Sequence, residues 1–329
     1  MDSWLVYKLT GGKRFCTDYS NASRTQLFDI TRLAWDEGIC RLFGISSSCL
    51  AAVCGSDENF GETDFGGYLG KPIPIHGVLG DSHGALFGQG CLEPGMVKAT
   101  YGTGSSIMMN VGKKPIFSTS GLITSLAWGL GGNVEYVLEG NINYTGAVIS
   151  WLKDSLGLVE SPGETEELAR SANPEDRTYL VPAFSGLGAP YWDSEATAVL
   201  SGMTRTTGKA EIAKAALDSI AYQITDIVRI MEKDSGLPIK ELRADGGPTK
   251  NRYLMQFQSD LTGKPVQVSA LEELSGTGAA YAAGMALGIY DRDIFGRVKR
   301  SLFAPQMDIA VREEKYGGWK QAVSLALRG

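Results

Sequence analysis

Two glycine-rich turns carry the residue types best suited to binding a phosphorylated ligand. The first spans residues 100–106 (Thr-Tyr-Gly-Thr-Gly-Ser-Ser) and the second spans residues 244–251 (Ala-Asp-Gly-Gly-Pro-Thr-Lys-Asn). Glycine lacks a Cβ, so its backbone can turn sharply and approach a ligand closely. Each turn follows a strand-like run, and the second leads into a predicted helix over 252–260, whose N-terminus would favour phosphate. Together the turns could hold a nucleotide by its phosphates and its base.

Each turn taken alone also fits an ordinary strand–turn pair in a glycine-rich α/β domain. Neither contains the G-x-x-x-x-G-K-[ST] pattern of a P-loop or the G-x-G-x-x-G pattern of dinucleotide-binding folds. The turns therefore predict close backbone approach to a ligand without fixing the class of protein.

Asp81 is the strongest candidate for acid–base chemistry. It follows a predicted strand over 74–78 and lies between Gly80 and Gly84. Open α/β sheets bind ligands at the carboxyl ends of their strands, and a carboxylate there can accept a proton from a substrate hydroxyl. An aspartate before a short helix also fits an N-cap that has no other role. Its neighbour His83 is a candidate substrate donor or a structural polar residue.

Composition narrows the class of protein. The 329 residues are 43% hydrophobic with a net charge of −6, which is enough for two domains with their own cores. The acidic balance, without lysine or arginine blocks, argues against nucleic acid or an anionic membrane as the main partner. Five cysteines without a C-x-x-C pair and two histidines argue against a zinc site. With no signal-peptide or membrane-span pattern, the sequence predicts a soluble cytoplasmic protein with free thiols.

The order of predicted elements indicates an α/β fold, because strands alternate with helices through short turns. Helices are predicted over 1–9, 35–43, 85–90, 144–156, 209–233, 252–260, 276–288 and 316–327. Strands are predicted over 74–78, 96–99, 105–111, 124–128, 136–138, 179–184, 241–243 and 265–268.

Several motifs in a fixed order resemble the FGGY carbohydrate kinases, and most closely their glycerol kinase branch. The similarity runs nearly end to end, which makes it far more specific than either turn alone. The motifs that carry it are Asp18-Tyr19-Ser20-Asn21-Ala22-Ser23-Arg24-Thr25, Gly80-Asp81 with Ala85-Leu86-Phe87-Gly88-Gln89, Tyr101-Gly102-Thr103-Gly104, Gly186-Leu187-Gly188-Ala189-Pro190-Tyr191-Trp192-Asp193, residues 202–223 and Asp245-Gly246-Gly247.

The resemblance implies an actin/hexokinase-like fold of two RNase-H-like domains, the first incomplete. Residues 1–88 would form the C-terminal part of the substrate domain and residues 89–329 the nucleotide-binding domain. The implied reaction is ATP- and Mg²⁺-dependent phosphorylation of a polyol or sugar hydroxyl, with Asp81 as general base. The positions implied to bind the nucleotide are Thr103, Gly104, Gly146, Ser150, Gly246, Gly247 and Asn251. The full-length protein is expected to be a homo-oligomer.

The substrate-binding positions implied by the resemblance are Asp81, Ser82, His83 and Ser106. Glycerol kinases usually carry Gln at the position of Ser82 and tend to carry Phe at the position of Ser106. Two serines would make the pocket larger and more polar, which suits a longer polyol or a ketose such as xylulose or ribulose.

The family's N-terminal Asp-x-Gly-Thr hairpin occurs nowhere in the sequence. The chain therefore resembles the C-terminal two-thirds of a kinase, and residues 1–329 alone are expected to bind nucleotide weakly without transferring phosphate. A non-catalytic remnant that binds nucleotide is the alternative. An in-frame upstream segment in the genome would distinguish a fragment from a remnant.

Overall fold

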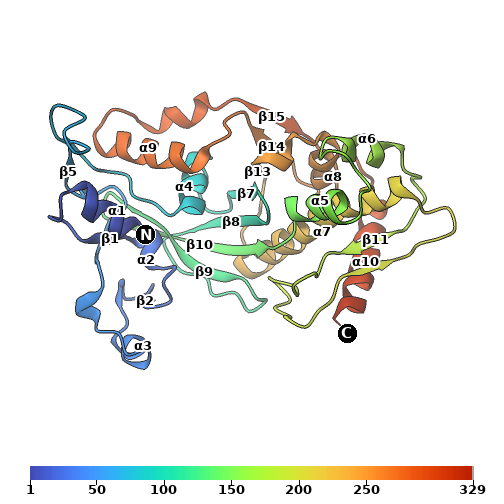
Figure 1. The fold of residues 1–329 in the computed structure, drawn as a ribbon, viewed down its shortest axis with the longest axis horizontal. Coiled ribbons are helices and arrows are strands. Elements are labelled where there is room, and N and C mark those ends of the chain that lie inside the picture. Colours follow the sequence, from blue (N-terminus) through green and yellow to red (C-terminus); the bar gives the residue numbers. More distant parts are fainter. Residues whose placement is uncertain (328–329) are drawn as a thin grey trace.

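A seven-stranded mixed sheet forms the centre of the molecule in the computed structural model, which describes residues 1–327 (Figure 1). The strand order is β15-β14-β13-β7-β8-β10-β9. The bounds are β7 Val97–Tyr101, β8 Ser105–Gly112, β9 Ile123–Leu130, β10 Asn133–Ile142, β13 Leu242–Asp245, β14 Val266–Ser269 and β15 Arg300–Phe303. β7 pairs with β13 in parallel and with β8 antiparallel, so the two glycine-rich turns leave neighbouring strands at the same edge of the sheet.

Helices cover both faces of this sheet. The long helix α7 (Lys209–Ser235), α8 (Arg252–Thr262) and α10 (Ile309–Ala326) share one apolar core, into which Val97, Ala99 and Tyr101 of β7 project. On the other face, α4 (Asp81–Gly88) and α9 (Leu274–Ala286) form a smaller core with Met108. Because side chains alternate along a strand, Lys98 and Thr100 point toward this second face.

α4 and α9 pack backbone to backbone, and they lie side by side in Figure 1. A Cβ on Gly278 of α9 would collide with the carbonyl oxygen of Gly84 in α4, and one on Gly88 would collide with that of Leu274. Glycine is required at these contacts because any side chain would separate the helices. This packing fixes the position of Asp81, the first residue of α4.

Short elements make up residues 1–80. They are α1 Asp2–Leu9, β1 Cys16–Asp18, α2 Tyr19–Ala22, β2 Phe28–Asp29, β3 Ala34–Trp35, α3 Glu37–Leu42, the 3₁₀ turn Ser47–Cys49, β4 Ala52–Cys54, β5 Glu62–Thr63 and β6 Ile73–Pro74. Their strands pair only two at a time, β1 with β4 in parallel. Asp18 caps the N-terminus of α2, and its buried carboxylate accepts hydrogen bonds from Ser20, Asn21 and Ser56.

The remaining elements are short. They are α5 Gly146–Ser150 with the π-helical continuation Trp151–Ser155, α6 Glu164–Ser171, β11 Tyr179–Val181, β12 Val199–Ser201, and 3₁₀ helices at Gly247–Lys250 and Arg292–Arg297. No helix within residues 1–327 is long and apolar enough to cross a membrane.

The predicted alternation of strands and helices is confirmed, and three of the local differences have a clear physical reason. The strand expected over 74–78 is only Ile73–Pro74, because proline offers no N–H to a ladder and Gly77 has φ +73°. The strand expected over 179–184 ends at Val181, directly before Pro182. The C-terminal helix begins at Ile309 rather than near 316, because Asp308 caps it by accepting from the Ala310 N–H at 2.8 Å.

Candidate functional site

The first glycine-rich turn joins β7 to β8 and is held by backbone hydrogen bonds to α5. The Gly102 N–H donates to the Gly104 carbonyl at 2.7 Å, and the Gly146 N–H donates to the Gly102 carbonyl at 2.9 Å. A Cβ on Gly104 would collide with the Ile142 carbonyl, and one on Gly146 would lie 2.8 Å from the Gly102 carbonyl oxygen. The turn and the start of α5 are therefore in backbone contact, which only glycine permits.

The second turn leaves β13 at Asp245 and lies against the first. Gly246 has φ +100°, and a Cβ there would collide with the Tyr101 carbonyl oxygen. Asn251 then caps α8, because its side-chain oxygen accepts from the Leu254 N–H at 3.0 Å. The Asn251 amide donates to the Thr165 hydroxyl at 3.2 Å, so this side chain links the turn to α6.

A cavity of about 710 Å³, here named the turn cavity, lies where the two turns meet α5, α6 and α7. This volume is in the range of small-molecule and cofactor sites. Five of the seven predicted nucleotide positions line it: Thr103, Gly146, Ser150, Gly247 and Asn251. Gly104 and Gly246 are outside the lining and instead shape the turns.

Apolar residues complete the turn cavity, and the sequence did not single them out as site residues. Ile149, Pro162, Leu217, Ile220 and Leu254 contribute its walls. Ile220 belongs to the apolar stripe of α7, which the sequence pattern predicts to be core and which consists of Ile212, Ala216, Ile220, Ile224, Ile227 and Met231. Of these residues Ile220 lines the cavity, and nothing in the periodicity distinguishes it from the rest.

Asp81 lies in the first turn of α4, with Gly80 as the N-cap residue. The N-cap alternative for Asp81 is therefore wrong. The Asp81 carboxylate is exposed, and within residues 1–327 its one hydrogen bond is with the neighbouring Ser82 N–H at 2.5 Å. It does not line the turn cavity.

The other substrate-binding candidates differ in accessibility. Ser82 and Ser106 are half-buried. His83 is only 2% exposed, and its Nε2 has no hydrogen-bond partner. Burial does not favour a direct contact between the His83 ring and a substrate. Burial, with the Arg24 and Lys98 charges nearby, lowers the pKa of His83 to about 3.

This low pKa predicts a defined acid sensitivity. Between its ordinary pKa of about 6.5 and about 3, His83 binds a proton in the unfolded state but not in the folded one. Stability should thus fall as the pH falls through this window, by up to about 1.4 kcal/mol per pH unit. His83→Gln should remove this contribution. Urea unfolding of both proteins from pH 7 to pH 4.5 measures it, and parallel stability curves would contradict the assignment.

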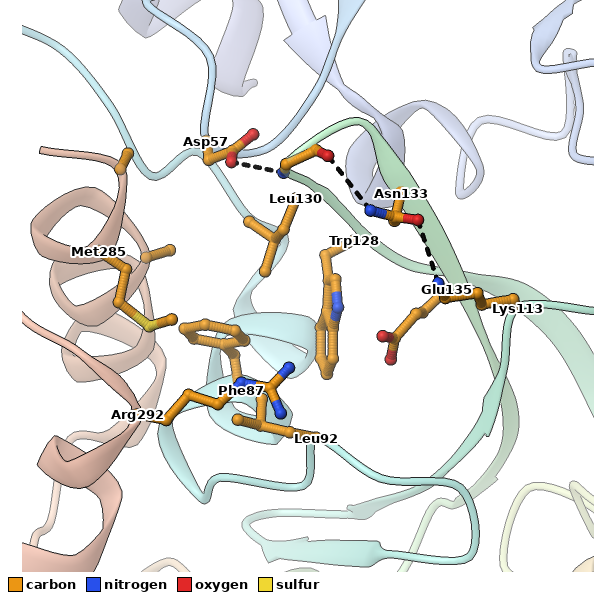
Figure 2. A pocket seen from close by; sticks show the side chains of 13 residues that line it. Asp57, Phe87, Leu92, Lys113, Trp128, Leu130, Asn133, Glu135, Met285 and Arg292 are labelled. Carbon is orange, nitrogen blue, oxygen red and sulfur yellow. Dashed lines mark hydrogen bonds between the residues drawn. The ribbon is translucent and has the colours of Figure 1, made fainter. Parts of the chain in front are cut away.

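Two further cavities are present, and one of them adjoins the turn cavity. One of about 540 Å³ shares Gly247 and Lys250 with the turn cavity and is also lined by Gly246. The other, of about 370 Å³, lies between α4, α9 and the β9–β10 hairpin and contains none of the predicted site residues (Figure 2). The side chains of Phe87, Trp128 and Met285 form its apolar wall.

Comparison with known proteins matches this chain to the two domains of one protein family. Residues 1–88 match the N-terminal domain of the FGGY family of carbohydrate kinases, and residues 97–287 match its C-terminal domain. The glycerol kinase of Carboxydothermus hydrogenoformans is 48% identical over 99% of this chain, and that of Symbiobacterium thermophilum is also 48% identical. The chain spans 66% of the length of each of these relatives.

Solved structures agree in fold. The Plasmodium falciparum glycerol kinase with ADP superposes with a TM-score of 0.92 at 37% identity, over 99% of this chain and 66% of that one. A ligand-bound xylulose kinase from Lactobacillus acidophilus shares the fold with a TM-score of 0.84 at 20% identity, over the same shares of the two chains. The chain belongs to the FGGY family of carbohydrate kinases and has their actin/hexokinase-like α/β fold.

Proposed function

We propose that this chain serves in the ATP-dependent phosphorylation of a hydroxyl group on a small polyol or sugar. The observation that carries the proposal is the turn cavity, where five positions matched to nucleotide contacts converge from three separate stretches of sequence. The similarity of the chain to carbohydrate kinases, including a glycerol kinase solved with ADP, also supports this function.

The turn cavity offers different chemistry at its two sides. Leu217, Ile220 and Leu254 provide an apolar surface suited to an adenine ring. The Thr103 hydroxyl and the surrounding glycine backbone lie at the end of β7 and suit the phosphates. Phosphoryl transfer depends mainly on positioning and charge stabilisation, so these groups with one base and a metal ion can suffice.

In this proposal Asp81 accepts the proton of the attacking hydroxyl. Its exposed and nearly unpaired carboxylate supports the role. Within residues 1–327 no cluster of three or more His, Cys, Asp or Glu side chains could hold a metal by itself. Mg²⁺ commonly binds one or two carboxylates together with substrate phosphates, so the phosphates of ATP would supply part of its coordination. Mg²⁺ would there neutralise phosphate charge.

The acceptor is proposed to be a polyol or ketose of four or five carbons. The similarity to glycerol kinases supports a polyol, and the half-buried Ser82 and Ser106 support one longer than glycerol. We predict a higher kcat/KM for erythritol, xylulose or ribulose than for glycerol. A coupled ADP-release assay on the full-length protein with these four acceptors measures it, and a preference for glycerol would contradict the prediction.

Restoring the residues usual in glycerol kinases provides the reciprocal test. Ser82→Gln with Ser106→Phe should shift preference back toward glycerol, because an amide and a ring reduce the pocket. Ser106 also accepts a hydrogen bond from Lys98, so Ser82→Gln alone is the matched control that leaves this contact intact. If neither variant changes the ratio of kcat/KM for glycerol to kcat/KM for the longer acceptors, residues outside this pair select the acceptor.

A further inference from the structure

Lys98 is a fully buried lysine at the centre of the sheet. It lies on β7, opposite Arg243 of β13 and Met108 of β8, and its exposed fraction is 0%. Its Nζ donates to the Thr100 hydroxyl at 3.0 Å and to the Ser106 hydroxyl at 3.2 Å. Within residues 1–327 no carboxylate forms a direct ion pair with it. A buried ammonium held by neutral hydroxyls is costly, and burial accordingly lowers the pKa of Lys98.

Carboxylates from three elements surround this ammonium without touching it. Asp245 at the end of β13, Glu139 on β10 and Asp81 on α4 all favour its charged form, with Asp245 having the largest effect. One cation beside these carboxylates is Arg24, which pairs with Glu139 at 2.7 Å. Arg243, opposite Lys98 on β13, pairs with Glu241 at 2.9 Å, and His83 stays neutral at pH 7 because its pKa is about 3.

Lys98 is bonded to the residues that flank the first glycine-rich turn and lies near the start of the second. Thr100 and Ser106 flank the first turn on β7 and β8. Asp245 begins the second turn and accepts from the Gln89 amide at 2.9 Å. Burial raises the pKa of Asp245, and Lys98 is the strongest influence opposing that rise. Removing the ammonium would leave the Thr100 and Ser106 hydroxyls without their hydrogen-bond donor. It would also leave the buried Asp245 carboxylate without a nearby positive charge.

We propose that Lys98 is a positioning residue for the nucleotide phosphates, because its buried ammonium bonds to both strands that flank the first glycine-rich turn and its charge offsets the carboxylates nearby. The inference rests on the proposed function, since it concerns the same nucleotide. Without Lys98, the net charge of the surrounding side chains becomes more negative where phosphates must approach. The adenine side of the turn cavity is lined by apolar residues and should not sense this change.

The test compares ADP with adenosine. In Lys98→Met, which keeps the length of the side chain but removes its charge, ADP affinity should fall about 10- to 100-fold, the worth of a charge-assisted contact. Adenosine affinity should change less than about 2-fold. Lys315→Met, which removes another lysine whose pKa burial lowers, is the matched control on α10.

A second variant covers the case in which Lys98→Met does not fold. Thr100→Val removes one acceptor of the ammonium at nearly constant shape, and the same selective loss of ADP affinity is expected, with Lys98→Arg retaining part of the wild-type affinity. Equal losses for ADP and adenosine, or unchanged ADP affinity in a folded Lys98→Met protein, would overturn the inference. Failure of the wild-type chain to bind either ligand would instead contradict the proposed function.

Discussion

Asp81→Asn in the full-length protein should lower kcat by roughly 10²- to 10⁴-fold, the usual contribution of a positioned general base. The amide has nearly the same shape but cannot accept the proton of the acceptor hydroxyl. ADP affinity should stay within about 2-fold, because Asp81 does not line the turn cavity. Stability should fall by no more than about 1 kcal/mol, the worth of a charge near a helix N-terminus.

The matched control for this variant is Asp293→Asn, another exposed aspartate in the first turn of a short helix. It should leave kcat unchanged. Steady-state kinetics with the preferred acceptor, together with ADP titration, provide both measurements. Near-wild-type turnover in Asp81→Asn would exclude the base, because an amide cannot accept the proton of the acceptor hydroxyl.

Gly247→Leu should weaken ADP binding by about 10- to 100-fold or more, because the side chain would occupy the turn cavity and displace charge-assisted contacts. The substitution suits the backbone: Gly247 lacks a positive φ, and a Cβ there meets no atom within 4 Å. Loss of affinity would thus report occupation of the cavity rather than misfolding.

Gly317→Leu makes the same change on the exposed surface of α10, where a Cβ also meets nothing within 4 Å. Its ADP affinity should equal that of the unmodified chain. Isothermal titration of both variants measures the difference. If Gly247→Leu binds ADP as well as Gly317→Leu does, the nucleotide site lies elsewhere.

The sequence predicted the parts of the site that depend on local backbone chemistry. Glycines at 102, 104, 246 and 247 mark turns in any context, and the structure places them in or around two adjoining turns. The long helix α7 follows from its periodic apolar stripe, which tertiary packing then buries.

Residues whose environment comes from distant segments were not predictable in this way. Lys98 alternates with buried apolar residues on β7, yet its burial depends on α4 lying against the second face of the sheet. The sequence shows His83 only as a polar residue close to the catalytic candidate Asp81. The packing of α4 against the sheet buries it. The apolar walls of the turn cavity, such as Ile149 and Pro162, come together only in the fold.

The turn cavity is expected to bind a nucleotide, a claim that titration of residues 1–329 with ADP in the presence of Mg²⁺ tests directly. We expect saturable binding at a single site, weak but with a Kd below about 1 mM, that Gly247→Leu abolishes and Gly317→Leu preserves. No saturable binding to the folded chain, or binding that Gly247→Leu leaves unchanged, would contradict the claim.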